Sequence, residues 1–409
     1  MPKSRAAIRG YGRDRSISIN HLQELLRHVS SSVPYYAKYR HALLGEFPIV
    51  TKSDVRAHYP RFFSNHVPPA IVDAILGQVA ALESQGSPNA WMEDAGTFIL
   101  EKSSGTTGPA TWYPRSKREA LVLSLDLVSA RRAIVPSYRT ADLLNLDAFV
   151  GRIYHESASP EEAFVRLIKN HVSAGRRLVY GAASLLAMIA RYVQKTGTSC
   201  KVPIIESRGE VLTRERYTLI KKAFQGEILN QYACREVWGI GYAVAPETAF
   251  TICNGTIVEV IGPDGHVISA PGVIGSIAVT SLRLREFPVV RFATGDRGSW
   301  LVAGSGLARL ILEENREAGM LEGSDGIRRG GKALFCVLFE ELRSSGEGAI
   351  NQDWKVEKLG SLLVIWLHPS EMRYSRAIAR RVNENRILFG AGSVEFRTWK
   401  GWRLGQKQS

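Results

Sequence analysis

The chain has 409 residues, of which 45% are hydrophobic and 22% charged, a composition typical of a folded globular protein and a length that predicts more than one domain. Its apolar runs are too short to cross a bilayer, and its four cysteines show no Cys-x-x-Cys spacing. We therefore expect no membrane segment, zinc ribbon or disulfide framework, and a cytoplasmic location. The formal net charge of +14 would attract any polyanion, but the basic residues stand in scattered pairs without a nucleic-acid-binding signature.

Hydrophobic spacing predicts an α/β protein in which helices alternate with strands at first and strands follow one another beyond residue 250. Leu22, Leu25, Leu26 and Val29 lie on one face of a predicted helix that ends near the serines and the proline at 30–34. Amphipathic helices over 162–168 and 185–193 flank a short strand over 178–181, which predicts α/β layering. Strands over 257–261 and 275–280 follow, and then a strand over 362–367 and a helix over 376–386.

A loop rich in glycine and hydroxyl side chains follows a strand-like segment at 97–100. It reads Lys102-Ser103-Ser104-Gly105-Thr106-Thr107-Gly108-Pro109. Glycine permits backbone angles at which successive N–H groups converge on an anion, and the hydroxyls can donate to the same phosphate oxygens. Pro-Ala follows the last glycine where a Walker A loop needs Lys-Ser or Lys-Thr. The pattern predicts a triphosphate-binding loop of another kind, with a plain polar turn as the alternative.

A second cluster, Asn230-Gln231-Tyr232-Ala233-Cys234-Arg235-Glu236, follows the apolar pair 228–229. An aromatic side chain at a strand end can stack on a purine, which makes Tyr232 a candidate for binding a base. Glu236, four residues further on, can hold Mg²⁺ beside phosphate oxygens. Taken one at a time, Tyr232 is better explained by core packing and Glu236 by surface exposure than by these roles.

Two more segments supply candidate nucleotide contacts. Asp296 follows Gly295 at a predicted strand end, where its two oxygens can accept both hydroxyls of a ribose; an ordinary turn is the alternative. Gly209 and Glu210 come after a predicted strand over 202–205, where their backbone can lie against an adenine. Five residues between the motifs are candidates to line an acyl pocket, although core packing explains them as well: Tyr180, Gly181, Trp238, Gly239 and Tyr242.

In their order and separation these segments resemble the adenylate-forming superfamily of acyl-CoA synthetases, luciferases and peptide-synthetase adenylation domains. Residues 103–108 resemble its phosphate loop, 230–236 its Asn-x-Tyr-Gly-x-Thr-Glu motif, and 294–296 its ribose motif. The segment 25–52 is similar to the branch of phenylacetate–coenzyme A ligases and capsular-polysaccharide biosynthesis proteins. The resemblance covers about residues 20–330 well and the remainder weakly.

The resemblance implies an ATP- and Mg²⁺-dependent enzyme that acts on a small-molecule carboxylic acid. Thr106 and Thr107 would hold the β- and γ-phosphates, Tyr232 the adenine, Asp296 the ribose and Glu236 the Mg²⁺. The acid would attack the α-phosphorus, expel pyrophosphate and form an acyl-adenylate, whose acyl group then passes to coenzyme A. Transfer to an amine and a non-catalytic nucleotide-binding homologue are the alternatives. We expect no nucleic-acid or membrane partner and leave a homodimer open.

The resemblance also implies a large multi-layer domain with mixed sheets over 1–321 and a small α+β lid domain over 322–409 that rotates about 323–325. The sequence departs from the family pattern in four places. The loop's usual lysine is missing after Pro109; Ala233 and Arg235 replace the motif's Gly and Thr, with Arg235 still able to reach a phosphate as a charge. Gly323 stands where an arginine contacts the ribose. The catalytic lid lysine has only Lys407, and after it Lys400, as candidates.

Overall fold

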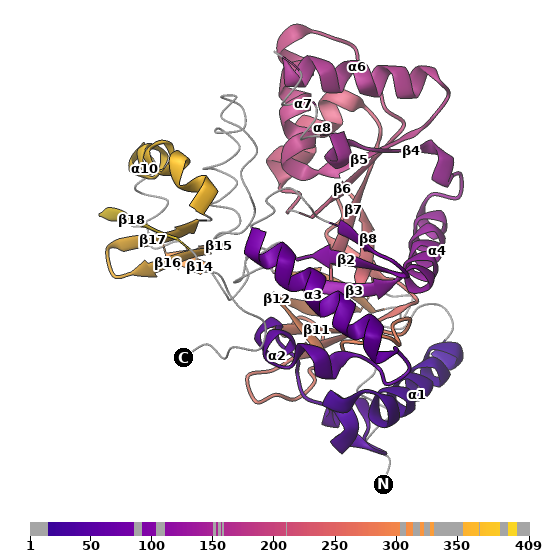
Figure 1. Cartoon of the computed structure of the whole chain (residues 1–409). Helices are drawn as coiled ribbons and strands as arrows, with labels where there is room; N and C mark the ends of the chain where they lie inside the picture. Colours follow the sequence, from indigo (N-terminus) through magenta and orange to yellow (C-terminus); the bar gives the residue numbers. More distant parts are fainter. Residues whose placement is uncertain are drawn as a thin grey trace.

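The computed structural model describes residues 15–85, 92–103, 111–149, 153, 157, 159–209, 211–302, 308–313, 320–322, 328–330, 355–367, 369–384 and 392–398. Within them the main element is a ten-stranded mixed sheet of order β10-β11-β12-β13-β9-β8-β7-β6-β5-β4 (Figure 1). Its strands are β4 (Leu143–Asn145), β5 (Leu178–Ala182), β6 (Ile204–Arg208), β7 (Glu227–Cys234), β8 (Trp238–Val244), β9 (Ala249–Ile252), β10 (Thr256–Ile261), β11 (Gly275–Ser281), β12 (Phe292–Val302) and β13 (Ala308–Leu312).

Strands β4 to β7 form the parallel half of this sheet and are covered on both faces. On one face Val179, Ile205 and Ile228 pack against side chains of α6 (Pro160–Ser173), α7 (Ala183–Thr196) and α8 (Arg214–Phe224). On the other face their neighbours at 178, 204 and 229 pack beneath the end of α4 (Lys117–Ile134). Side chains alternate along a strand, so two covered faces require the near-continuous apolar runs seen here.

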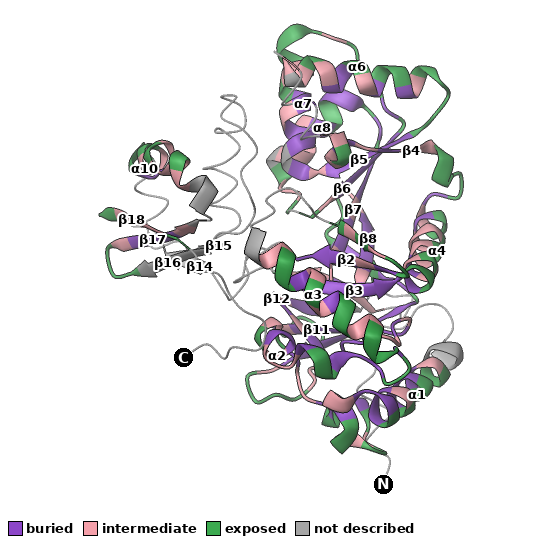
Figure 2. Cartoon of the chain, in the orientation of Figure 1, coloured by how far each residue is buried: buried purple, intermediate pink, exposed green. Residues whose placement is uncertain are grey.

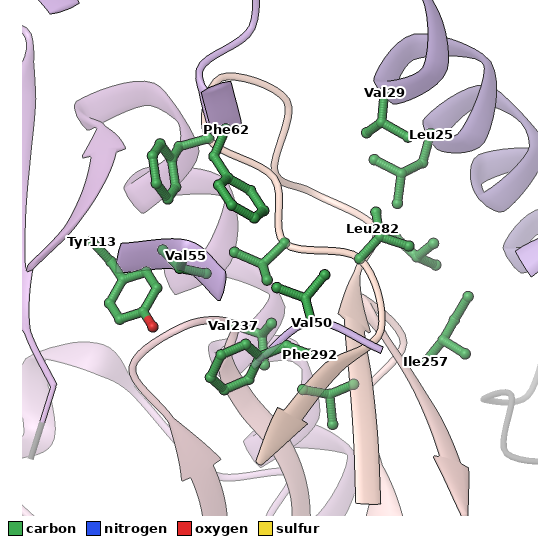
Figure 3. Close-up of a cluster of buried hydrophobic side chains, with 14 of the residues drawn as sticks. Leu25, Val29, Val50, Val55, Phe62, Tyr113, Val237, Ile257, Leu282 and Phe292 are labelled. Atoms are coloured by element: carbon green, nitrogen blue, oxygen red, sulfur yellow. The ribbon is translucent and has the colours of Figure 1, made fainter. Parts of the chain in front are cut away.

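Strands β7 to β13 form the antiparallel half, and the N-terminal segment packs against it (Figure 2). Figure 3 shows Leu25 and Val29 beside Leu282, and Val50 beside Phe292, within this core. Val50 also joins the sheet through its backbone, since its N–H donates to the Arg291 carbonyl over 3.0 Å. The segment comprises α1 (Arg15–Ser32), η1 (Pro34–Tyr39), η2 (Leu44–Glu46), α2 (Lys52–Ala57), η3 (Tyr59–Phe62) and α3 (Pro69–Gln85).

Three smaller sheets complete the described structure. An antiparallel sheet contains β1 (Met92–Ala95), β2 (Phe98–Lys102) and β3 (Trp112–Ser116). Further along are the pair β14 (Met320–Glu322) and β15 (Arg328–Gly330), and a sheet of β16 (Lys355–Leu359), β17 (Leu362–Leu367) and β18 (Ser393–Thr398). The last sheet is accompanied by α10 (Ser375–Glu384), whose Ile378 and Val382 are buried. Of the remaining short 3₁₀ helices, η4 (Thr140–Asp142) and η5 (Leu146–Phe149) flank β4, and η6 (Pro369–Tyr374) precedes α10.

The expected fold class is confirmed: a mixed α/β architecture with a large mixed sheet and a small C-terminal α+β unit. The strand expected over 202–205 instead runs over Ile204–Arg208, because parallel pairing with β5 and β7 continues through Ser207 and Arg208. The first helix extends to Ser32, where the Ser30 hydroxyl donates back to the Leu26 carbonyl over 2.8 Å. Across the described ranges no helix combines the length and apolarity that a membrane crossing demands. The domain boundary at 321/322 stays a prediction.

Candidate active site

The structure describes the two ends of the predicted phosphate loop. Strands β2 and β3 pair as far as Lys102 and Trp112. Beyond them the Ser103 N–H donates to the Thr111 carbonyl over 2.9 Å, and the Thr111 N–H donates to Ser103 Oγ over 2.8 Å. The two residues at which the chain leaves and re-enters the hairpin, Ser103 and Thr111, are therefore bonded to each other, and both are buried. The loop candidates between them lie outside the described residues: Ser104, Gly105, Thr106, Thr107 and Gly108.

A buried ion pair joins this hairpin to the turn between β7 and β8. Arg115 on β3 donates from Nε to Glu101 Oε2 on β2 over 2.9 Å, and both side chains are at most 3% exposed. Arg115 Nη2 also donates to the backbone carbonyl of Arg235 over 2.8 Å, and a longer contact of 3.5 Å reaches the carbonyl of Glu236. The turn that carries two candidate residues is thus held against the base of the loop.

Side chains from the turn and from the start of β8 contact the same glutamate. Trp238 Nε1 donates to Glu101 Oε2 over 2.5 Å, and the Arg115 guanidinium lies 5.2 Å from the centre of the Trp238 ring. Arg235 Nη1 lies 3.4 Å from Glu101 Oε1, and its side chain is 34% exposed. Arg235 is therefore held beside the β2–β3 hairpin, on the accessible side of the buried pair.

Glu236 is 5% exposed, whereas its position in a turn favoured the surface. Burial raises the pKa of the Tyr113 hydroxyl, and the nearby Glu236 carboxylate raises it further. That hydroxyl makes no hydrogen bond of standard geometry in this conformation. Burial and then Glu236 likewise raise the pKa of the Cys234 thiol, to which Asp296 adds in the same direction. Glu236 and Asp296 therefore both lie near the Cys234 thiol, and Glu236 also lies near Tyr113 on the hairpin.

Tyr232 and Asp296 are in direct contact. The Tyr232 hydroxyl donates to Asp296 Oδ2 over 2.9 Å and lies 3.3 Å from Thr294 Oγ1. The Asp296 N–H donates to Thr294 Oγ1 over 3.1 Å, and the preceding Gly295 has φ +76°, which allows the turn within β12. The Tyr232 ring is 7% exposed and packs 5.8 Å from the Phe250 ring. Tyr232 is thus a core residue whose hydroxyl orients the carboxylate of the ribose candidate.

Gly209 follows the carboxyl end of β6, exposed and with φ +72°. The residue before it, Arg208, stacks 4.1 Å from the centre of the Tyr180 ring and pairs with Asp147 over 3.2 Å. In open parallel sheets this edge is where ligands bind. The other candidates, Glu210, Lys407 and Lys400, and the expected hinge at 323–325, lie outside the described residues.

The residues at the site can be tested against a magnesium ion. Mg²⁺ bound with a nucleotide takes one or two carboxylates and keeps phosphate and water oxygens as its other ligands. No group of three or more His, Cys, Asp or Glu side chains in the described ranges forms a metal site. Glu236, which is 5% exposed, is the candidate that would supply such a carboxylate. This donor set fits an ion carried mainly by phosphate oxygens.

The sequence analysis missed Glu101 and Arg115, the two residues that bring the loop and the turn together. A signal was present, because each is a charged residue that follows apolar residues in a strand-like segment: Glu101 follows Phe98-Ile99-Leu100, and Arg115 follows Trp112-Tyr113-Pro114. Charged side chains are almost never fully buried unless they are paired. Which partner each would find depends on the sheet that forms, and no local pattern encodes it.

Comparison with known proteins gives a likeness of fold and no match of sequence family. No protein-family model and no curated protein matches the chain. Among solved structures, 2-hydroxyisobutyryl-CoA ligase in complex with R3-HIB-AMP, in its postadenylation state, matches with a TM-score of 0.57 and 13% identity over 96% of this chain and 88% of that chain. The same ligase with 2-HIB-AMP and CoA, in its thioesterification state, matches with a TM-score of 0.56 and 15% identity over 94% and 86%. The chain therefore has the fold that the resemblance implied.

Proposed function

We propose, from this adenylate-forming fold, that the protein is an ATP-dependent ligase that activates a carboxylic acid as an acyl-adenylate and transfers the acyl group to coenzyme A. One observation carries the proposal: residues from three separate motifs meet around Cys234. The loop hairpin brings Tyr113, the β7–β8 turn brings Glu236, and β12 brings Asp296 with its partner Tyr232. Different segments must contact the phosphates, the ribose and the base of one nucleotide. Segments that come together in this way support a nucleotide site.

In the first half-reaction, an oxygen of the substrate carboxylate forms a bond to the α-phosphorus of ATP as the bond to the pyrophosphate oxygen breaks. We assign the phosphates to the loop residues Ser103, Ser104, Gly105, Thr106, Thr107 and Gly108. Arg235 supplies a positive charge toward the leaving pyrophosphate, and Glu236 holds Mg²⁺, which neutralises phosphate charge when bound. Positioning and charge neutralisation are sufficient for this step.

The other end of the nucleotide is assigned to the second group of candidates. Asp296 accepts the ribose hydroxyls, with its carboxylate oriented by the Tyr232 hydroxyl. Gly209 and Glu210 lie along the base, which Tyr232 borders. In the second half-reaction, the thiol of coenzyme A attacks the acyl carbon and AMP leaves. We assign the lid role to residues 322–409, with Lys407 as its catalytic lysine in the first step and Lys400 as the second candidate.

The proposal is tested by exchange of labelled pyrophosphate into ATP in the presence of a panel of aryl and small carboxylic acids. At least one acid is expected to drive exchange, and Glu236→Gln is expected to abolish it. Glu247→Gln is the matched control, because Glu247 is 63% exposed and pairs with Arg309 at the surface. If no acid drives exchange in the wild-type protein, the proposal is wrong.

The acceptor is tested separately, with the acid that drives exchange. Incubation with ATP and coenzyme A is expected to yield the acyl thioester, identified by mass spectrometry. A parallel incubation with simple amines in place of coenzyme A supplies the comparison. Amide formation without thioester formation would retain the adenylation step and overturn the assignment of coenzyme A.

A further inference from the structure

The side chain of Arg115 connects two parts of the proposed site and belongs to neither. Its side chain is 2% exposed, so it contacts no ligand directly. Its Nε–H bonds Glu101 within the loop hairpin over 2.9 Å, and its Nη2 bonds the Arg235 carbonyl in the turn over 2.8 Å. A planar guanidinium fixes the directions of these donors, which a lysine ammonium cannot do.

Glu101, the anionic partner of Arg115, accepts hydrogen bonds from two different elements. Glu101 Oε2 accepts from Arg115 on the hairpin and from Trp238, which begins β8 directly after the turn, the second over 2.5 Å. The Trp238 backbone has φ +66°, an unusual conformation for a residue with a side chain, and its ring lies against the Arg115 guanidinium. The turn is therefore secured to the hairpin through its backbone and through a side chain.

We propose that Arg115, together with Glu101, is a positioning residue for adenylation, because it fixes the β2–β3 hairpin, from which the predicted phosphate loop extends, against the turn that carries Arg235 and Glu236. The inference rests on the proposed function and adds residues to which that function gives no role. The β2–β3 hairpin and the β7–β8 turn belong to different sheets of the molecule. A hairpin whose loop would bind the phosphates and a carboxylate that would hold Mg²⁺ must keep a fixed separation to act on one nucleotide.

The molecule contains a second buried pair of the same kind, which serves as a matched control. Arg291 Nε donates to Glu259 Oε2 over 3.0 Å, and the side chains are 4% and 6% exposed. Arg291 Nη1 also donates to two backbone carbonyls, those of Gly45 and Phe47, over 3.0 and 2.7 Å. This pair fastens the N-terminal segment to the sheet and involves none of the candidate site residues.

The test compares Arg115→Lys with Arg291→Lys in the full-length protein. Both substitutions keep the positive charge but remove the planar guanidinium that donates to several acceptors at once. Thermal unfolding is therefore expected to show similar losses of stability for the two variants. Pyrophosphate exchange is then measured against Mg²⁺ concentration at a temperature at which both variants are folded. For Arg115→Lys we expect a fall in kcat and a rise in the half-saturating Mg²⁺ concentration, each on the order of 10- to 100-fold, as for loss of residues that orient ligands and metal. Arg291→Lys is expected to leave both values unchanged.

A milder variant covers the case in which Arg115→Lys does not fold. Trp238→Phe removes the indole N–H that bonds Glu101 and keeps an aromatic ring beside Arg115, so it is expected to shift both values in the same direction by a smaller factor. Equal behaviour of Arg115→Lys and Arg291→Lys, or wild-type values for Trp238→Phe, would overturn the inference while leaving the proposed function intact. Absence of exchange in the wild-type protein overturns both.

Discussion

The two ends of the proposed nucleotide site are built in different ways. At the phosphate end, Glu101 and Arg115 are both buried, and they hold the turn through charged groups. At the ribose end, one neutral hydroxyl of Tyr232 orients the half-buried carboxylate of Asp296. A buried charge that loses its partner is far more costly than a lost neutral hydrogen bond. The comparison predicts that the phosphate end tolerates substitution least.

The largest loss of stability is expected from Glu101→Gln, which leaves the buried Arg115 guanidinium without an anion. The expected decrease in the free energy of unfolding is about 3–5 kcal/mol, measured by urea denaturation. The double variant Glu101→Leu with Arg115→Met removes both charges and is expected to recover much of that loss. If Glu101→Gln alone were as stable as the wild type, the phosphate end would not be the more sensitive of the two.

A smaller loss is expected from Tyr232→Phe, which keeps the ring against Phe250 and removes only the hydroxyl. The hydrogen bond to the Asp296 carboxylate is worth about 1–2 kcal/mol of the free energy of unfolding. The Michaelis constant for ATP is expected to rise, because the carboxylate loses the donor that orients it. Asp296→Asn and the double variant show whether the effect acts through that carboxylate. If it does, the two substitutions together have a smaller effect than the sum of their separate effects.

The half-buried Cys234, which interacts electrostatically with Glu236 and Asp296, gives the stability a pH dependence. Because the pKa of Cys234 is raised by burial and by Glu236, the folded protein keeps a proton that the unfolded chain releases above about pH 9. The free energy of unfolding therefore falls as pH rises above that value, by at most about 1.4 kcal/mol per pH unit for one group. Cys234→Ala is expected to reduce this slope relative to the wild type, measured by denaturation between pH 8 and about pH 10. An unchanged slope would exclude Cys234 as a contributor.

The smallest change in stability is expected from Arg235→Gln. The ion pair of Arg235 with Glu101 is long, at 3.4 Å, and its guanidinium is one-third exposed, so its loss costs less than about 1 kcal/mol. Pyrophosphate exchange is nevertheless expected to fall by about tenfold or more, since a charge beside the phosphates is lost. Arg235→Lys is expected to restore part of the activity. Full activity of the glutamine variant would remove Arg235 from the mechanism.

The sequence predicted the parts of the fold that depend on local patterns. The strand over 362–367 is β17, and the helices around 162–168 and 185–193 are α6 and α7. The boundaries near residues 202–208 differed because pairing with two neighbouring strands extends β6 through polar residues that favour a loop. The roles of the loop residues, Glu210 and Lys407 remain predictions.

Periodicity and motif order, which are properties of the chain itself, determined the α/β class and the candidates at 103–108, 230–236 and 294–296. Only the tertiary structure decided that Tyr232 would bond Asp296 and that Glu236 would be buried beside Tyr113. The same holds for Arg115, which reaches residues 120 positions away in the chain. The physical reason is that a buried charge must find its partner in three dimensions, and the packing of the sheets selects which one it meets.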